Sequence, residues 1–312
     1  MASSDAGRIT PILVERRFPV DLSHSIQSIE DLYDASKRAR WDPNSSIPWN
    51  QLKPDAYTAA VRQAAALSWS RRAWIEYTAL PETPSLLIRF CVELDREVDP
   101  KYYLSVRSTE EAWHVEVCHR MANELAGYVN QPANPAYGAV FNGTLAREAL
   151  DADNLLDGYV AAHCAVEDSL DLELWRGYLD NARDPVVRAA LEHCVEDKKR
   201  HAAFGWLYLE ARHKGWDDAA RQGIQAAVET YITGMELRGY HCAWLAEQDS
   251  AGNSVAADIV EADRVTAEAG LGALTPEQEA DILRSAIGGA RERLAALGVA
   301  VPDIDDPRTG RF

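Results

Sequence analysis

Long apolar runs are missing from this 312-residue sequence. No stretch approaches the roughly 18 consecutive apolar residues that a transmembrane helix needs, so we expect no membrane span. The N-terminal segment Met1–Phe18 also lacks the hydrophobic core of a secretory signal. On both grounds the sequence predicts a cytoplasmic protein.

Cysteine is scarce and irregularly spaced. The five cysteines are odd in number and include no Cys-x-x-Cys pair: Cys91, Cys118, Cys164, Cys194 and Cys242. This pattern argues against a disulfide framework and against a zinc ribbon. It predicts free, buried thiols.

Basic residues are also fewer than acidic ones. The chain has 32 lysine and arginine residues against 49 aspartate and glutamate residues, which gives a formal net charge of −17. An acidic surface repels nucleic acid and anionic membranes, so we expect neither as a partner. The hydrophobic fraction of 47% is sufficient for a sizeable core.

Convincing strand alternation is also absent, and apolar residues recur instead with the 3.6-residue period of helices. The sequence therefore predicts an all-α protein. Pro81 and Pro84 are expected to close the second helix, and Asp184-Pro185 to open the sixth. The expected helices span residues 26–40, 55–80, 86–98, 102–128, 145–180, 185–214, 217–247, 255–269 and 276–297.

These helices are expected to fall into three parts. Residues 1–50 comprise an N-terminal arm, extended over about 25 residues, and the first helix. Residues 51–250 form a helical bundle with a loop at Asn130–Tyr137. Residues 251–312 form a C-terminal helical extension and tail.

Two of the predicted helices place a histidine on an apolar face. Glu111 and His114 are three residues apart, so they share one side of their helix. His201 lies on the apolar stripe of the helix over residues 185–214, but the residue three positions before it is Lys198. Asp197, four positions before His201, is the alternative acid on that helix.

Two further helices each place one glutamate on an apolar stripe. Glu76 lies with Trp69 and Leu80, and Glu167 lies with Cys164 and Leu170. Burying an isolated carboxylate is costly, so each glutamate should have a partner. That partner is a metal ion, an arginine or a backbone group.

Taken in order, these motifs resemble the ferritin-like di-iron carboxylate superfamily, especially its bacterial non-haem di-iron oxygenases and N-oxygenase-like members. Those proteins supply a glutamate, a Glu-x-x-His pair, a second glutamate and a second Glu-x-x-His pair from four helices. Ser108–Leu125 is similar to the first pair, and Glu196–Phe204 to the second. The resemblance covers about residues 55–212. It implies a ferritin-like four-helix bundle core with additional N- and C-terminal helices.

The resemblance also implies a metal site that holds one or two iron ions, with manganese as an alternative. Glu111 would bridge the two ions. The ligands would be Glu76, Glu111, His114, Glu167 and His201, with Asp197 as a substitute acid. The implied activity is that of an oxygenase or oxidase that activates O₂ and oxidises a small organic molecule. Its electron donor is not identified by the sequence, and a homodimer is one possible assembly. The alternative is a catalytically inactive scaffold subunit of a multicomponent oxygenase.

Lys198 departs from this family pattern. A protonated lysine adds a positive charge where the family has a carboxylate, and two like unit charges 4 Å apart repel by about 4 kcal/mol at an effective dielectric constant of 20. Three interpretations of Lys198 follow. It is a neutral residue that acts as a weak ligand or as a proton donor with a catalytic role. Alternatively, its ammonium group replaces the second metal and pairs with Glu167 and Glu111, or the site is inactive. We expect less bound metal than in a complete di-iron protein.

Overall fold

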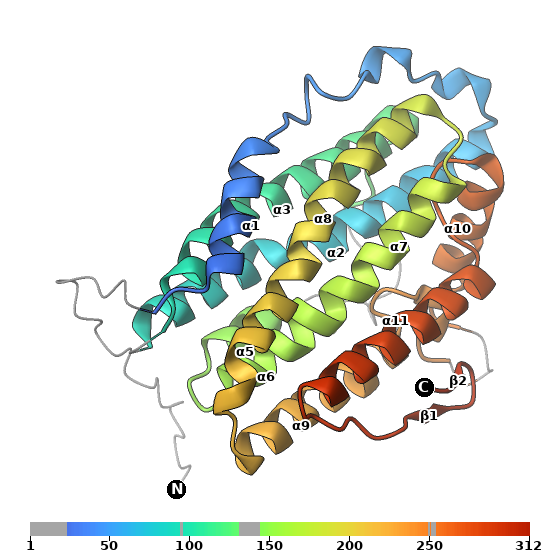
Figure 1. The fold of residues 1–312 in the computed structure, drawn as a ribbon. Coiled ribbons are helices and arrows are strands. Elements are labelled where there is room, and N and C mark those ends of the chain that lie inside the picture. The colour runs from blue at the N-terminus through green and yellow to red at the C-terminus, as the bar shows by residue number, and fades with distance from the viewer. Residues whose placement is uncertain (1–23, 94–95, 131–143, 249, 251–253) are drawn as a thin grey trace, which may run out of the picture.

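The computed structural model describes residues 24–93, 96–130, 144–248, 250 and 254–312. In these ranges the regular structure is almost entirely helical (Figure 1), which confirms the expected all-α class. The exception is the antiparallel pair β1 (Asp305–Asp306) and β2 (Gly310–Arg311). Most of the predicted N-terminal arm and of the predicted loop at Asn130–Tyr137 lies outside the described residues.

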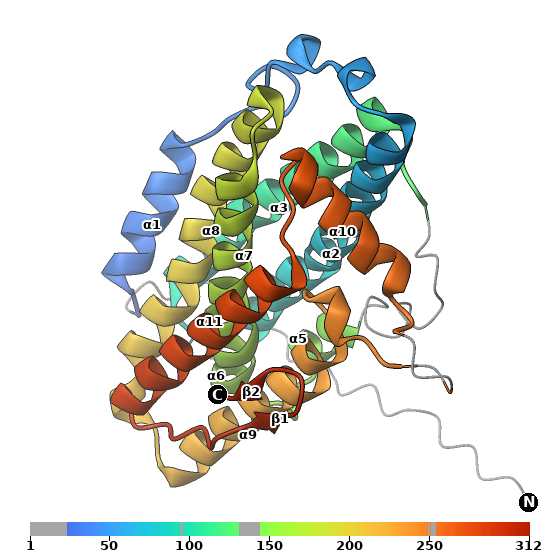
Figure 2. The same ribbon diagram turned by 90° about the vertical axis from the view of Figure 1, so that its right-hand side faces the viewer.

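Four long helical segments form the central bundle and lie side by side in both views (Figures 1 and 2). They are α2 (Ala59–Val92), α3 (Val98–Leu125), α8 (Pro185–Arg212), and α7 (Asp168–Asn181) with the π-helical segment η3 (Val160–Glu167) before it. Their facing sides bury large side chains such as Trp69, Tyr103, Met121, Trp175 and Tyr208.

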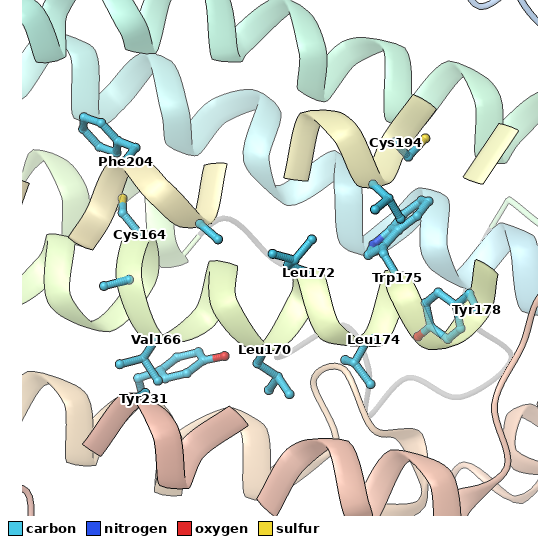
Figure 3. Close-up of a cluster of buried hydrophobic side chains, with 14 of the residues drawn as sticks. Cys164, Val166, Leu170, Leu172, Leu174, Trp175, Tyr178, Cys194, Phe204 and Tyr231 are labelled. Atoms are coloured by element: carbon cyan, nitrogen blue, oxygen red, sulfur yellow. The ribbon is translucent and has the colours of Figure 1, made fainter. Parts of the chain in front are cut away.

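Shorter helices cover the outside of this bundle. The N-terminal helix α1 packs on α3 and α8, α10 packs on α2, and α11 packs on α7. Figure 3 shows Leu170 and Leu174 of α7 pointing towards this C-terminal layer, whereas Trp175 points towards α8. The bounds of the outer helices are Gln27–Arg38 (α1), Thr144–Leu150 (α5), Leu156–Tyr159 (α6), Asp218–Gly234 (α9), Ala257–Ala269 (α10) and Pro276–Ala296 (α11).

The prediction that Pro81 and Pro84 end the second helix is wrong, because α2 continues through both prolines to Val92. Each proline removes one backbone hydrogen bond. Tertiary contacts outweigh that loss: Phe90 is fully buried, and Arg89 donates to the Asn154 carbonyl at 2.8 Å. The segment predicted as a separate helix over residues 86–98 is therefore the second half of α2, and the next helix begins at Val98.

Two other predicted boundaries also differ from the structure. The helix expected over residues 145–180 is divided into α5, α6, η3 and α7. The helix expected over residues 217–247 ends at Gly234, and the chain then turns at Gly239, whose φ of 91° is disfavoured for other residues. The predicted start of α8 is confirmed, because Asp184 caps it by accepting from the Val186 and Val187 amides.

Four of the cysteines are free, buried thiols, as expected: Cys118, Cys164, Cys194 and Cys242. Cys91 differs from the expectation in being only half-buried. None of the helices in the described ranges combines the length and the apolar composition that crossing a bilayer requires.

Candidate metal centre

The residues predicted on three helices meet in the middle of the bundle. Glu76 comes from α2, Glu111 and His114 from α3, and Lys198 and His201 from α8. All five side chains are buried, with exposed fractions between 0% and 4%. Their helices bring them together because each residue lies on the apolar face that its helix turns towards the bundle axis.

Both histidines have one ring nitrogen held by a carboxylate behind them. The Nε2 atom of His114 lies 3.2 Å from Asp197 Oδ2, and the Nε2 atom of His201 lies 3.0 Å from Glu110 Oε2. The Nδ1 atoms of both rings therefore face the glutamates of the bundle core. A metal-binding histidine is usually held in this way, with its second nitrogen on a carboxylate.

Arg200 connects these two supporting carboxylates. Its guanidinium hydrogen-bonds to Glu110 Oε1 at 2.7 Å and also to Asp197. Trp41, in the loop after α1, donates its indole N–H to Asp197 Oδ2 at 2.8 Å. Asp197, which the sequence offered as a substitute metal ligand, thus lies behind His114 and is held by Trp41 and Arg200.

Three of the predicted ligands bring donor atoms close together. One donor atom each from Glu111, His114 and His201 lie within 4.8 Å of one another, all on buried side chains. Glu111 Oε2 and His201 Nδ1 are among the buried polar atoms that make no hydrogen bond in the described residues, and His201 Nδ1 lies 3.2 Å from Glu111 Oε1. A buried polar atom without a hydrogen bond lowers the stability of the fold, so these two atoms are suited to binding a metal ion.

Glu111 is also fixed from the outer side. Arg107, one helical turn earlier on α3, donates to Glu111 Oε1 at 3.0 Å. The same guanidinium binds both oxygens of Asp168 at 2.6 and 2.9 Å. Glu111 Oε2, which makes no hydrogen bond among the described residues, lies 3.7 Å from His114 Nδ1, whereas Oε1 lies 3.2 Å from His201 Nδ1.

Lys198 lies inside the cluster and is paired with carboxylates. Its Nζ atom is 2.6 Å from Asp171 Oδ2, 2.8 Å from Glu76 Oε2 and 3.9 Å from Glu111 Oε2. Burial alone would lower the pKa of Lys198, but Asp171 and Glu76 hold it well above the usual range. The lysine is therefore charged, which argues against the neutral form considered from the sequence. Its partners are Glu76 and Asp171, not Glu167.

Glu167 lies at the edge of the same cluster. It lines a cavity of about 30 Å³ together with Glu76, Glu111, Asp171 and Lys198. Its Oε2 atom is 2.6 Å from His163 Nδ1. Burial raises the pKa of Glu167 well above its usual range, which favours the protonated form. A cavity of this size holds a water-sized molecule or two, or O₂, without side-chain movement.

Carboxylates outnumber the fixed positive charges in this cluster. The excess holds the pKa of both His114 and His201 above the usual value, although burial alone would lower it. The cluster thus favours additional positive charge, which either protons or a bound cation can supply. The carboxylates are Glu76, Glu110, Glu111, Asp168, Asp171 and Asp197, and the fixed cations are Arg107, Lys198 and Arg200.

The donor set therefore fits one divalent ion of the iron or manganese type. Two imidazoles and one carboxylate are ligands that non-haem iron accepts. A second ion is harder to place, because a dication near the Lys198 ammonium meets a repulsion of about 4 kcal/mol for each unit of charge at 4 Å.

Several members of this cluster were not found from the sequence. Glu110 is next to Glu111 and so points in a different direction from the helix, and no local pattern connects it with His201. Asp171 had one available signal, since it follows Glu167 by four residues and shares its face. Trp41 comes from outside the bundle and carries no recognisable spacing.

No family model and no curated protein matches the sequence. The structure, however, aligns with an R2-like ligand-binding oxidase that has an aerobically reconstituted metal cofactor after photoconversion. The TM-score is 0.63 at 12% identity, covering 88% of this chain and 94% of that chain. A mutant of an R2-like ligand-binding oxidase with an anaerobically reconstituted Mn/Fe cofactor aligns at a TM-score of 0.62 and 13% identity, with the same coverage. This chain has a ferritin-like fold.

The ferritin-like fold accounts for the placement of the cluster. Proteins of this fold build metal sites from carboxylates and histidines that project inward from four facing helices. In this chain α2, α3 and α8 provide Glu76, Glu111, His114 and His201 at the centre of the bundle, with Glu167 at its edge. The assignment of these residues as metal ligands remains a prediction.

Proposed function

We propose that this chain is a non-haem metal-dependent oxidase or oxygenase that acts with O₂ on a small organic molecule. The observation that carries the proposal is the buried group of Glu111, His114 and His201, whose donor atoms lie within 4.8 Å of one another. Iron is the expected metal, with manganese as an alternative. The solved relatives of this fold support it, because their names describe oxidases with a metal or Mn/Fe cofactor.

The protein side chains have separate roles in this proposal. Glu111, His114 and His201 hold the ion, and bound iron or manganese supplies the electron-transfer chemistry with O₂. Asp197 and Glu110 fix the orientation of the two imidazoles through their Nε2 atoms. The small cavity beside Glu111 and Glu167 admits O₂, whereas an organic substrate needs side-chain movement to reach the ion.

A metal-binding experiment combined with O₂ uptake tests the proposal. The protein is expressed with added iron and manganese, its metal content is measured, and O₂ consumption is followed after anaerobic loading with Fe(II) and addition of ascorbate. The parent should bind metal and consume O₂ faster than free Fe(II) does. The His114→Ala and Glu111→Ala variants should lose both properties, whereas Glu116→Ala, at the exposed surface of α3, should keep them.

A scaffold subunit without its own catalysis is the second candidate. The observation that favours it is the Lys198 ammonium, which already neutralises part of the cluster through Glu76 and Asp171. A scaffold should bind no metal under the conditions above. A parent protein that binds no iron or manganese would therefore refute the oxidase proposal and favour the scaffold.

A further inference from the structure

We propose that the Lys198 ammonium occupies the place of a second metal ion, so that this bundle holds a single divalent ion between Glu111, His114 and His201. The inference rests on the proposed metal-dependent function. It differs from the two-ion arrangement that the resemblance implies, because it assigns a protein side chain as one of the two cations.

The first argument is the surroundings of the ammonium group. Carboxylates from three helices converge on Lys198 Nζ, at 2.8 Å for Glu76 of α2, 2.6 Å for Asp171 of α7 and 3.9 Å for Glu111 of α3. The same atom lies over the Trp175 ring, 5.7 Å from the ring centroid. Anionic groups from several helices surround a bundle metal ion in the same manner.

The second argument is the set of donors that remains. Glu111 Oε2 and His201 Nδ1 make no hydrogen bond among the described residues, and His201 Nδ1 lies 3.2 Å from Glu111 Oε1. His114 Nδ1 lies 3.7 Å from Glu111 Oε2 and shares Glu76 Oε2, at 3.2 Å, with Lys198. These three atoms suffice for one ion with open positions. Glu76 Oε2, by contrast, already accepts from Lys198.

The third argument is the shortage of carboxylates for a second ion. The family pattern places an acid three residues before the last histidine, and this chain has Lys198 there. Glu167, the remaining acid of the pattern, is hydrogen-bonded to His163 at 2.6 Å. A second ion would therefore have to displace the ammonium from Glu76 and Asp171 and would gain no ligand from position 198.

The experiment compares metal stoichiometry in the parent, Lys198→Glu and Lys199→Glu. Lys199 is the matched control, because it is the neighbouring residue, is exposed and, within the described ranges, pairs only with Glu196 on the helix surface. Each protein is stripped with a chelator and titrated with Mn(II), bound ions are counted after gel filtration, and the electron paramagnetic resonance spectrum is recorded. The parent and Lys199→Glu should bind one isolated Mn(II), and Lys198→Glu should bind two coupled ions.

Each outcome decides between the inference and the function on which it rests. Two ions in the parent would overturn the inference and leave the proposed function intact, whereas no bound ion would overturn both. One ion in both the parent and Lys198→Glu would show that Lys198 is not what excludes the second ion.

A second variant covers the case in which Lys198→Glu does not fold. Lys198→Gln removes the charge without adding a ligand, so it should still bind one ion, with a dissociation constant at least tenfold lower than that of the parent. An unchanged or higher dissociation constant would mean that the ammonium does not share its carboxylates with the ion, which also overturns the inference.

Discussion

The guanidinium of Arg200 and the carboxylate of Glu110 are joined by a hydrogen bond of 2.7 Å, although 90 residues separate them in the chain. Through this contact one arginine supports both histidines of the centre, because Glu110 holds His201, and Asp197, also bound by Arg200, holds His114. Nη2 of the guanidinium makes both contacts, while Nη1 donates to the Glu196 carbonyl at 3.0 Å and holds the group in place. A lysine has only one nitrogen for these three contacts.

Arg200→Lys should therefore weaken metal binding while leaving the ligands in place. Loss of such supporting contacts usually lowers metal affinity about 10- to 100-fold, and we expect a decrease in this range. The measurement is a Mn(II) titration of the chelator-stripped protein. Arg176→Lys is the control, since Arg176 on α7 is half-buried, lies away from the metal ligands and pairs, among the described residues, only with Glu173. Equal affinities in the parent and Arg200→Lys would contradict the bridging role.

The sequence predicted the parts of this centre that depend on helix periodicity. Glu111 and His114 share a face because they are three residues apart, and His201 shares a stripe with Lys198 for the same reason. These relations are local, so one helix at a time is enough to predict them. The all-α class follows from the same periodicity.

The contacts between helices could not be predicted from the sequence. Glu110, Asp171 and Trp41 take their roles from partners on other elements, and nothing in their own segments selects those partners. The same limit explains the error at Pro81 and Pro84, where packing of α2 outweighs a local preference that would end the helix.

Asp171→Asn should destabilise the protein in the absence of metal. The substitution removes the negative charge 2.6 Å from the buried Lys198 ammonium and leaves Glu76 as its nearest partner. Breaking a buried ion pair from one side typically costs about 3–5 kcal/mol of unfolding free energy. With Glu76 still present, we expect a loss of about 3 kcal/mol in urea unfolding.

A double-mutant cycle separates the ion pair from other effects of Asp171. The double variant Asp171→Asn/Lys198→Gln should lose less unfolding free energy than the two single variants lose in sum, by more than about 1 kcal/mol. Asp180→Asn, on the exposed surface of α7, should change the unfolding free energy by less than about 0.5 kcal/mol. Additive losses would show that Lys198 and Asp171 do not interact.

His241 should make stability depend on pH in the neutral to alkaline range. Burial alone would lower the pKa of His241, but Glu236, whose Oε1 atom is 2.5 Å from Nδ1, raises it to about 9, and Asp171 and Glu167 add to this. The folded-state pKa is thus above the unfolded value of about 6.5. The stabilisation is complete below about pH 6.5 and is lost as the pH rises through 9.

The shift corresponds to about 3 kcal/mol of unfolding free energy at its largest. Urea unfolding of the parent at intervals from pH 6 to pH 9.5 should show the decrease. His241→Gln should be less stable at pH 6 and should lack this part of the pH dependence, because its side chain does not titrate. If the unfolding free energy of the parent stays constant or rises across this pH range, the raised pKa of His241 is contradicted.

Gly205 of α8 should tolerate no side chain, because α8 there touches the backbone of η3. A Cβ atom on Gly205 would overlap the carbonyl group of Cys164 and the amide nitrogen of Ala165, which are backbone atoms and cannot rotate away. Gly205→Ala must therefore push apart the two segments that carry His201 and Glu167. We expect a loss of at least about 3 kcal/mol of unfolding free energy, at the upper end for overpacking of a core.

Gly288→Ala in α11 is the matched control for this substitution. Gly288 is also in a helix, but apart from the adjoining backbone of that helix no described atom lies within 4 Å of the position where its Cβ would be placed. Alanine is favoured over glycine in a helix, so Gly288→Ala should raise the unfolding free energy by about 0.5–1 kcal/mol. Thermal and urea unfolding of both variants measure the contrast. If Gly205→Ala were as stable as Gly288→Ala, α8 and η3 would not be in backbone contact, and the placement of Glu167 beside Lys198 would be wrong.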